Sequence, residues 1–170
     1  MQVVIANAAE PQQHIGARQM KNLIKTFVQN TQDSANSIGS LALRVPAGII
    51  FAAHGAQKLF GWFGGYGLQG TAGWMESIGL TPGIPLTLMA GGAEFFGGLA
   101  LILGLLTRPA AFVLAITMLV AIFSVHFANG LFMSNNGYEF ALSLLAISVA
   151  LTFSGAGRFA IDNWLAKKLA

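Results

Sequence analysis

Six ionisable side chains lie within or beside stretches of this chain that are otherwise apolar. They are Arg44, His54, Lys58, Glu94, His126 and Glu139. A charged group in hydrocarbon costs about 3 kcal/mol unless it faces a partner or a water-filled cavity. Imidazole, carboxyl and ammonium groups that meet in such a cavity can donate a proton, accept one or stabilise a negative charge. The residue types therefore predict a polar site inside a membrane protein.

The apolar stretches predict four membrane-spanning helices. The chain has 170 residues, of which 55% are hydrophobic and only 9% are charged, whereas a soluble domain is about 25% charged. A spanning helix needs about 20 apolar residues. The predicted spans cover residues 41–60, 84–106, 109–127 and 138–153. The expected fold class is an all-α membrane protein built as a four-helix transmembrane bundle.

Basic residues lie on one side of these spans. The connections 61–83 and 128–137 contain no lysine or arginine, whereas basic residues precede the first span, separate the second from the third and follow the fourth. The positive-inside rule then places both ends of the chain in the cytoplasm. Arg44, near the inner end of the first span, is expected to be an interfacial anchor.

Three segments are expected outside the spans. Residues 1–40 should form a cytoplasmic segment, with a basic amphipathic helix around Met20–Val28 and then a linker. That helix either anchors on anionic lipid or docks a cytoplasmic partner. A short helix is predicted over Thr71–Ile78, in a connection that is either a lid over the bundle or an interfacial loop. Residues 41–162 form the transmembrane domain and 163–170 a cytoplasmic tail.

The chain also shows an internal similarity that indicates a duplicated helical hairpin. Phe51-Ala-Ala-His54 ends the first span and Phe123-Ser-Val-His126 ends the third, and a Glu-Phe pair follows in the next span of each, at Glu94 and Glu139. Parallel repeats of this kind are related by an axis along the membrane normal. We therefore expect two histidines and two glutamates to meet near the bundle centre, in its outer half.

Glu94 is the most informative of these residues. It lies about 15 Å into its span at 1.5 Å per residue, on a stripe of small residues that permits close helix approach. His54 and Lys58 are four residues apart and share one helix face. Glu94 therefore either forms a buried ion pair that fixes helix register or takes part in a functional site. Lys58 either joins that site or extends to the outer headgroups.

The available chemistry is limited by the absence of cysteine. This chain cannot supply a disulfide, a thiol relay or cysteine ligands for an iron–sulfur cluster. Two histidines and two glutamates are adequate metal ligands, but the Glu-x-x-His spacing of di-iron bundles is absent, so no metal is expected. A pocket for a quinone or a similar carbonyl compound fits better, because such groups can hydrogen-bond or protonate its oxygens.

Seven short motifs resemble the DoxX family, and together they extend from about Leu41 to Asp162. They are Arg44-Val-Pro-Ala-Gly48, His54-Gly55-x-x-Lys58-Leu59, Gly64-Gly65-x-Gly67, Gly91-Gly92-x-Glu94, Gly97-Gly98, Gly104-x-x-Thr107-Arg108 and Gly155-x-Gly157-x-x-x-Ile161-Asp162. The resemblance implies a small four-helix protein of the bacterial inner membrane. Some members of the family are linked to quinone-coupled sulfur oxidation, others to quinone or catechol detoxification or to thiol-redox membrane complexes.

The expected function is a membrane subunit of an oxidoreductase that interacts with quinone or quinol. Glu94, His54 and His126 are the expected catalytic residues, and Lys58, Glu139, Phe51 and Trp62 the expected quinone-binding residues. The expected partners are the lipid bilayer and either other protein subunits or further copies of the chain, with no nucleic acid. The alternatives are a non-enzymatic accessory or scaffold subunit of a larger complex, and a small transporter or channel.

Overall fold

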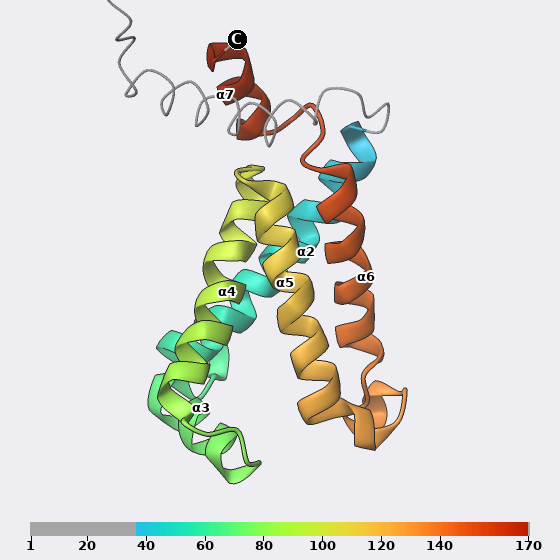
Figure 1. Ribbon diagram of the computed structural model, residues 1–170. Helices are drawn as coiled ribbons and strands as arrows, with labels where there is room; N and C mark the ends of the chain where they lie inside the picture. The colour runs from blue at the N-terminus through green and yellow to red at the C-terminus, as the bar shows by residue number, and fades with distance from the viewer. Residues whose placement is uncertain (1–36, 170) are drawn as a thin grey trace, which may run out of the picture.

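The computed structural model describes residues 37–169, which are almost entirely helical (Figure 1). Helices α2 (Ser37–Phe60) and α4 (Gly83–Leu103) are each long and apolar enough to cross a membrane. So is α5 (Thr107–Ala121), which continues through short turns as far as Asn129. Helix α6 (Glu139–Ser154) is apolar but shorter, at 16 residues. Residues 37–169 are thus all-helical and contain three candidate spanning helices.

Shorter helices connect or follow these four. In chain order they are the 3-10 helix η1 (Trp62–Gly64), α3 (Gly67–Ser77), the π-helix η2 (Ile122–His126), the 3-10 helices η3 (Phe127–Asn129) and η4 (Met133–Asn135), and α7 (Ile161–Leu169). The short helix predicted over Thr71–Ile78 is confirmed, because α3 covers nearly all of it. Helix α7 was not predicted, and the predicted amphipathic helix around Met20–Val28 lies outside the described residues.

The connections between the helices gather at two opposite ends of the molecule (Figure 1). The start of α2, the α4–α5 turn and α7 lie at one end, which we call the Arg44 end. Helix α3 and the turns that contain η2, η3 and η4 lie at the opposite end, which we call the α3 end. Helix α2 packs most extensively against α4, and α5 packs most extensively against α6. The bundle therefore consists of two helix pairs.

Glycine allows the first pair to pack closely. A Cβ atom placed on Gly48 would lie 2.7 Å from the carbonyl oxygen of Gly98, and one on Gly55 would lie 2.7 Å from the carbonyl oxygen of Gly91. These four residues, which we call the glycine seam, are seven residues apart on each helix and so recur on one face. Small residues at such positions let two backbones come into direct contact in a membrane.

Burial along α4 follows the stripe expected from the sequence. Thr87, Gly91, Glu94, Gly98 and Leu101 are all buried. They recur every three or four residues, which is the period of one helix face. The placement of Glu94 toward the interior is therefore confirmed, and it follows from the sequence pattern alone.

Arg44 is not the interfacial anchor that the sequence suggested, because its side chain is fully buried. Its guanidinium donates to the carbonyl oxygens of Leu101 and Ile102, at 2.8 and 2.7 Å, and to that of Phe159. The last turn of a helix has carbonyl groups without partners inside the helix, and a cation there also complements the helix dipole. Arg44 therefore caps α4 from a neighbouring helix.

Asp162, at the start of α7, makes the complementary contact at the N-terminus of α5. Its carboxylate accepts hydrogen bonds from the backbone N–H groups of Leu106 and Thr107, at 2.7 and 3.0 Å. A carboxylate at a helix N-terminus satisfies free N–H groups and complements the dipole. Gly104, which ends α4 with a φ of 66°, allows the sharp turn between the two capped ends. Arg44 and Asp162 together hold the α4–α5 turn.

Between this turn and the middle of the bundle the core is mainly aliphatic, although Ser148 of α6 is also buried there. Leu101, Leu114 and Leu151, from α4, α5 and α6, are each 0% exposed. Dense packing of this kind leaves few voids larger than a water molecule. The polar side chains nearer the α3 end are therefore separated from the Arg44 end by packed leucines.

The glycine seam predicts a difference between two glycines of the same helix pair. Gly55→Ala should destabilise the protein by about 1–3 kcal/mol, because the added methyl group meets the backbone of α4 and overpacks the contact. Gly92→Ala should be neutral or slightly stabilising, because nothing lies within 4 Å of its Cβ position and alanine favours a helix. Thermal unfolding of both variants in detergent measures the difference, and equal stabilities would contradict the close packing.

Candidate functional site

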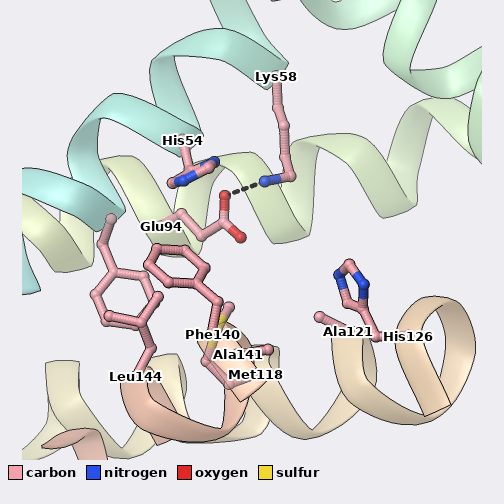
Figure 2. A pocket seen from close by; sticks show the side chains of 10 residues that line it. His54, Lys58, Glu94, Met118, Ala121, His126, Phe140, Ala141 and Leu144 are labelled. Atoms are coloured by element: carbon pink, nitrogen blue, oxygen red, sulfur yellow. Dashed lines mark hydrogen bonds and ion pairs between the residues drawn. The ribbon is translucent and has the colours of Figure 1, made fainter. Parts of the chain in front are cut away.

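A cavity of about 110 Å³ lies between the two helix pairs, in the half of the bundle nearer the α3 end (Figure 2). All four of the main helical segments contribute to its wall. The lining residues are Phe51, His54 and Lys58 from α2, Glu94 from α4, Met118, Ala121 and His126 from α5 and its π-helix, and Phe140, Ala141 and Leu144 from α6. The cavity therefore brings together side chains that are up to 93 positions apart in the chain, from Phe51 to Leu144.

An ion pair forms the polar side of this cavity. Lys58 Nζ lies 2.5 Å from Glu94 Oε2 (Figure 2). The Lys58 side chain is 25% exposed and that of Glu94 only 5%. The glycine seam explains the short distance, because Gly55 and Gly91 bring the two helices together one turn away from the pair. Lys58 thus turns toward Glu94 and does not extend to the headgroups.

The ion pair leaves hydrogen-bonding capacity for a ligand. An ammonium group has three N–H donors, and a carboxylate has four acceptor positions on two oxygens. Each partner uses one of these in the Lys58–Glu94 contact. A ligand in the cavity could therefore accept a hydrogen bond from Lys58 while the ion pair stays intact.

His54 lies beside the ion pair, one turn before Lys58 on the same face of α2. Its ring centroid is 5.9 Å from that of Phe140 on α6, at a tilt of 52°. This contact joins the two helix pairs across the cavity (Figure 2). Unlike the buried Glu94, His54 is exposed, which places it at the edge of the cavity.

His126 lies on the opposite side of the cavity, at the end of the π-helix η2. Its ring points up from α5 toward the side where Lys58 and Glu94 lie (Figure 2). Its Nδ1 atom is 2.8 Å from the backbone carbonyl oxygen of Asn136. The ring is therefore held by the turn that connects α5 to α6.

Two of the residues expected at the site do not line the cavity. Glu139 accepts a hydrogen bond from the backbone N–H of Met133 at 2.6 Å, so its carboxylate is directed at the connecting turn. Trp62 is 55% exposed and packs against Phe60, with 5.1 Å between the ring centroids. The structure thus brings together Phe51, His54, Lys58, Glu94 and His126, and places Glu139 and Trp62 elsewhere.

The remaining lining residues were not identified from the sequence. Met118, Ala121, Ala141 and Leu144 are ordinary apolar residues of predicted spans, so nothing in their type separates them from other core positions. Phe140 could have been found, because it forms the Glu-Phe pair of the internal similarity. Within residues 37–169, no three His, Asp or Glu side chains are grouped closely enough to hold a metal ion.

A second, apolar cavity of about 260 Å³ lies between α4 and α5. It is lined by Leu80, Leu86, Met89, Ala90, Ala93, Val113, Ile116, Thr117 and Val120. The hydroxyl of Thr117, the one polar side chain among them, donates to the carbonyl oxygen of Val113 at 3.0 Å. This second cavity, an apolar groove between α4 and α5, therefore offers a hydrocarbon surface and no free polar group, in contrast to the cavity at Glu94.

Comparison with known families matches residues 39–127 to the DoxX family model. The chain belongs to the DoxX family. The matched region contains the glycine seam, Arg44, Lys58, Glu94 and His126. It therefore includes every ionisable residue that lines the cavity, whereas Phe140, Ala141 and Leu144 of α6 lie beyond it.

Similar proteins occur in several bacteria. A protein of Bacillus subtilis named "Putative oxidoreductase CatD" is 35% identical over 130 residues, which is 76% of this chain and 89% of the relative. The "Inner membrane protein YqjF" of Escherichia coli is 36% identical over 139 residues, 77% of this chain and 95% of the relative. A protein of Haemophilus influenzae is 43% identical over 110 residues, 59% of this chain and 82% of the relative. No solved structure matches the chain significantly.

These findings establish the chain as a membrane protein of the DoxX family. The three long apolar helices and the inner-membrane relative agree on association with a lipid bilayer. The predicted family and the predicted membrane location are thus confirmed.

The ion pair predicts a specific pattern of stabilities. Lys58→Met should destabilise the protein by about 2 kcal/mol, because it leaves the buried carboxylate of Glu94 without its partner. Breaking a fully buried ion pair usually costs about 3–5 kcal/mol, and the partial exposure of Lys58 reduces that cost here. Adding Glu94→Gln should recover most of that loss, since no unpaired charge remains. Thermal unfolding of the single and double variants in detergent gives the coupling. Additive effects of the two substitutions would show that the pair is not formed.

Proposed function

We propose that the chain is a quinone- or quinol-interacting membrane subunit of an oxidoreductase, with the cavity at Glu94 as its binding pocket. The observation that carries the proposal is the Lys58–Glu94 pair, which lies in a cavity that two imidazoles and two phenylalanines also line. Small-molecule sites are typically apolar with a few converging polar groups. The relative named as an oxidoreductase supports the same reaction class.

The size of the cavity favours the head group of a lipid-soluble molecule. Pockets for whole drug-sized ligands occupy about 300–1,000 Å³, whereas this cavity occupies about 110 Å³. A single six-membered ring with oxygen substituents suits the smaller volume. The hydrocarbon tail of such a molecule would remain in the bilayer.

Each polar residue has a role in this proposal. The Lys58 ammonium donates a hydrogen bond to a ring oxygen and stabilises negative charge on it. Glu94 fixes the position of Lys58 and, with His54 and His126, accepts or donates the protons that accompany quinone reduction or quinol oxidation. Phe51 and Phe140 contribute apolar walls for the ring. Glu139 contributes through the turn that holds His126. Trp62, which packs on Phe60 away from the cavity lining, has no role in the pocket.

The finer features of the fold belong to the same proposal. We place the Arg44 end in the cytoplasm and the cavity in the outer half of the bilayer, because the basic residues gather at the Arg44 end. We also take α6 as a fourth span and the two helix pairs as a duplicated hairpin. The strong packing of α2 on α4 and of α5 on α6 supports the duplication.

A second candidate function is an accessory or scaffold subunit of a larger membrane complex. The observation that favours it is the apolar groove between α4 and α5, which is exposed on the outside of the bundle. Under this hypothesis the ion pair serves only to fix helix register. Co-purification with defined partner subunits and no measurable quinone binding would favour this candidate.

Quinone binding to two glutamate variants tests the proposed function. Glu94→Gln removes the charge that positions Lys58, so we expect the affinity for a fully ring-substituted benzoquinone to fall about tenfold, or about 1.4 kcal/mol. Glu76→Gln is the matched control, because Glu76 lies outside the cavity and accepts a hydrogen bond from the backbone of Gly83 that glutamine can still accept. Quenching of tryptophan fluorescence in detergent-purified protein measures the affinities.

The result is informative in both directions. Unchanged affinity in Glu94→Gln would contradict the assignment of the pocket. An equal loss in Glu76→Gln would show that any change of carboxylate charge weakens binding, which also contradicts it.

A further inference from the structure

The π-helix η2 gives His126 a position that a regular α-helix would not. Ala121 and His126 both line the cavity, although they are five residues apart. Successive residues of an α-helix turn by about 100°, so residues five apart face directions about 140° apart. A π-helix is wound with hydrogen bonds between residues five apart, which brings such residues toward one face, and π segments occur frequently at functional sites. The wider turn therefore directs His126 into the cavity.

The turn after η3 fixes which ring nitrogen of His126 carries the proton. The backbone carbonyl oxygen of Asn136, 2.8 Å from Nδ1, can only accept a hydrogen bond. Nδ1 must therefore be the protonated nitrogen when the ring is neutral. Nε2 then carries a lone pair and no hydrogen, so it can accept a proton and cannot donate one.

The conformation of the turn depends on Asn136. This residue has a φ of 59°, in the left-handed region that asparagine and glycine adopt much more readily than β-branched residues. Its N–H donates to the carbonyl oxygen of Met133 at 2.9 Å, and its own carbonyl oxygen also accepts from the Asn129 side chain at 3.3 Å. The backbone carbonyl that His126 contacts is therefore held from two sides.

The start of α6 anchors the same turn. Glu139 accepts from the N–H of Met133, and its own N–H donates to the carbonyl oxygen of Leu131 at 2.9 Å. These contacts explain why Glu139 lies close to the cavity without lining it. Its carboxylate supports the turn that holds His126.

The other ionisable groups around the cavity either form an ion pair with each other or lie at its edge. Lys58 and Glu94, from α2 and α4, are paired with each other. His54, also from α2, is exposed and packs on Phe140 of α6. Among the lining residues, His126 is thus the one with a backbone hydrogen bond, from Nδ1 to Asn136, that leaves Nε2 free to accept a proton.

We propose that His126 is the proton acceptor of the cavity and that the left-handed turn at Asn136 is the device that keeps its Nε2 atom unprotonated. This inference rests on the proposed function and names the direction of one step. The O–H bond of a bound hydroquinone breaks and its proton forms a bond to Nε2. The electron pair stays on the ring oxygen, whose negative charge Lys58 stabilises. The resulting imidazolium keeps its Nδ1–H on Asn136.

Nitrogen NMR of the full chain tests the tautomer directly. The chain has three histidines, so His14→Gln and His54→Gln leave His126 as the one labelled ring. We expect a neutral ring with a pyridine-type Nε2 signal and a pyrrole-type Nδ1 signal. A pyrrole-type Nε2 signal in this background would overturn the proposal.

Three variants of the turn separate the effect of the left-handed backbone at Asn136 from nonspecific disruption of the structure. Asn136→Gly keeps the left-handed backbone and should keep the tautomer. Asn136→Val disfavours that backbone and should cause loss of the pyridine-type Nε2 signal as the dominant form. Asn135→Val is the matched control, because Asn135 precedes it in η4 without a positive φ, and it should leave the signals unchanged. If Asn136→Val keeps the wild-type tautomer, the turn is not the device and the proposal fails.

Adding a ring-substituted benzohydroquinone to protein that keeps His54, with the His126 signals assigned by comparison with the His54→Gln variant, distinguishes this failure from failure of the proposed function. A response of the Nε2 signal to the hydroquinone supports both. The expected tautomer without any response would contradict the proposed ligand class, and with it the role of His126 as acceptor for that ligand. The wrong tautomer together with hydroquinone binding would overturn the inference and leave the proposed function standing.

Discussion

The structure depends on keeping one ammonium and one carboxylate in contact inside an apolar bundle. An isolated charge there is costly, whereas a hydrogen-bonded pair is tolerated. Lys58 and Glu94 can meet at 2.5 Å because Gly55 and Gly91 remove the side chains that would hold α2 and α4 apart. The glycines of the seam are therefore part of the site, although none of them carries a polar side chain.

The polar groups of the bundle fall into two kinds, according to what they bind. Arg44 and Asp162 form hydrogen bonds with backbone groups at the end of α4 and the start of α5, so they determine the geometry of the α4–α5 turn. Lys58 and Glu94 contact each other beside a cavity and keep donors and acceptors for a ligand. Leu101 belongs to the aliphatic core between these two regions. Polarity alone therefore does not single out a candidate functional site, whereas hydrogen-bonding capacity left over beside a cavity does.

Much of this arrangement could be predicted from the sequence, since helix periodicity assigns Glu94 to a buried stripe and places His54 and Lys58 on one face of α2. The role of Arg44 could not, because its partners are backbone carbonyl groups of α4 and of Phe159 that no side-chain pattern reveals. The same holds for Glu139, whose direction is set by a hydrogen bond within a turn. The π-helix before His126 also leaves no simple signal, because a sequence read with a period of 3.6 residues assumes a regular helix.

The central claim is that a ligand pocket exists between the two helix pairs, and the absence of cysteine from the chain makes it directly testable. Ala121 lines the cavity, whereas Ala115 lies in the packed part of the same helix. In protein reconstituted into lipid, a small membrane-permeant thiol reagent should modify Ala121→Cys much faster than Ala115→Cys. A fully ring-substituted benzoquinone, which cannot add to thiols, should slow the reaction at position 121 alone. Equal reactivity of the two variants, or no protection by the quinone, would contradict the account.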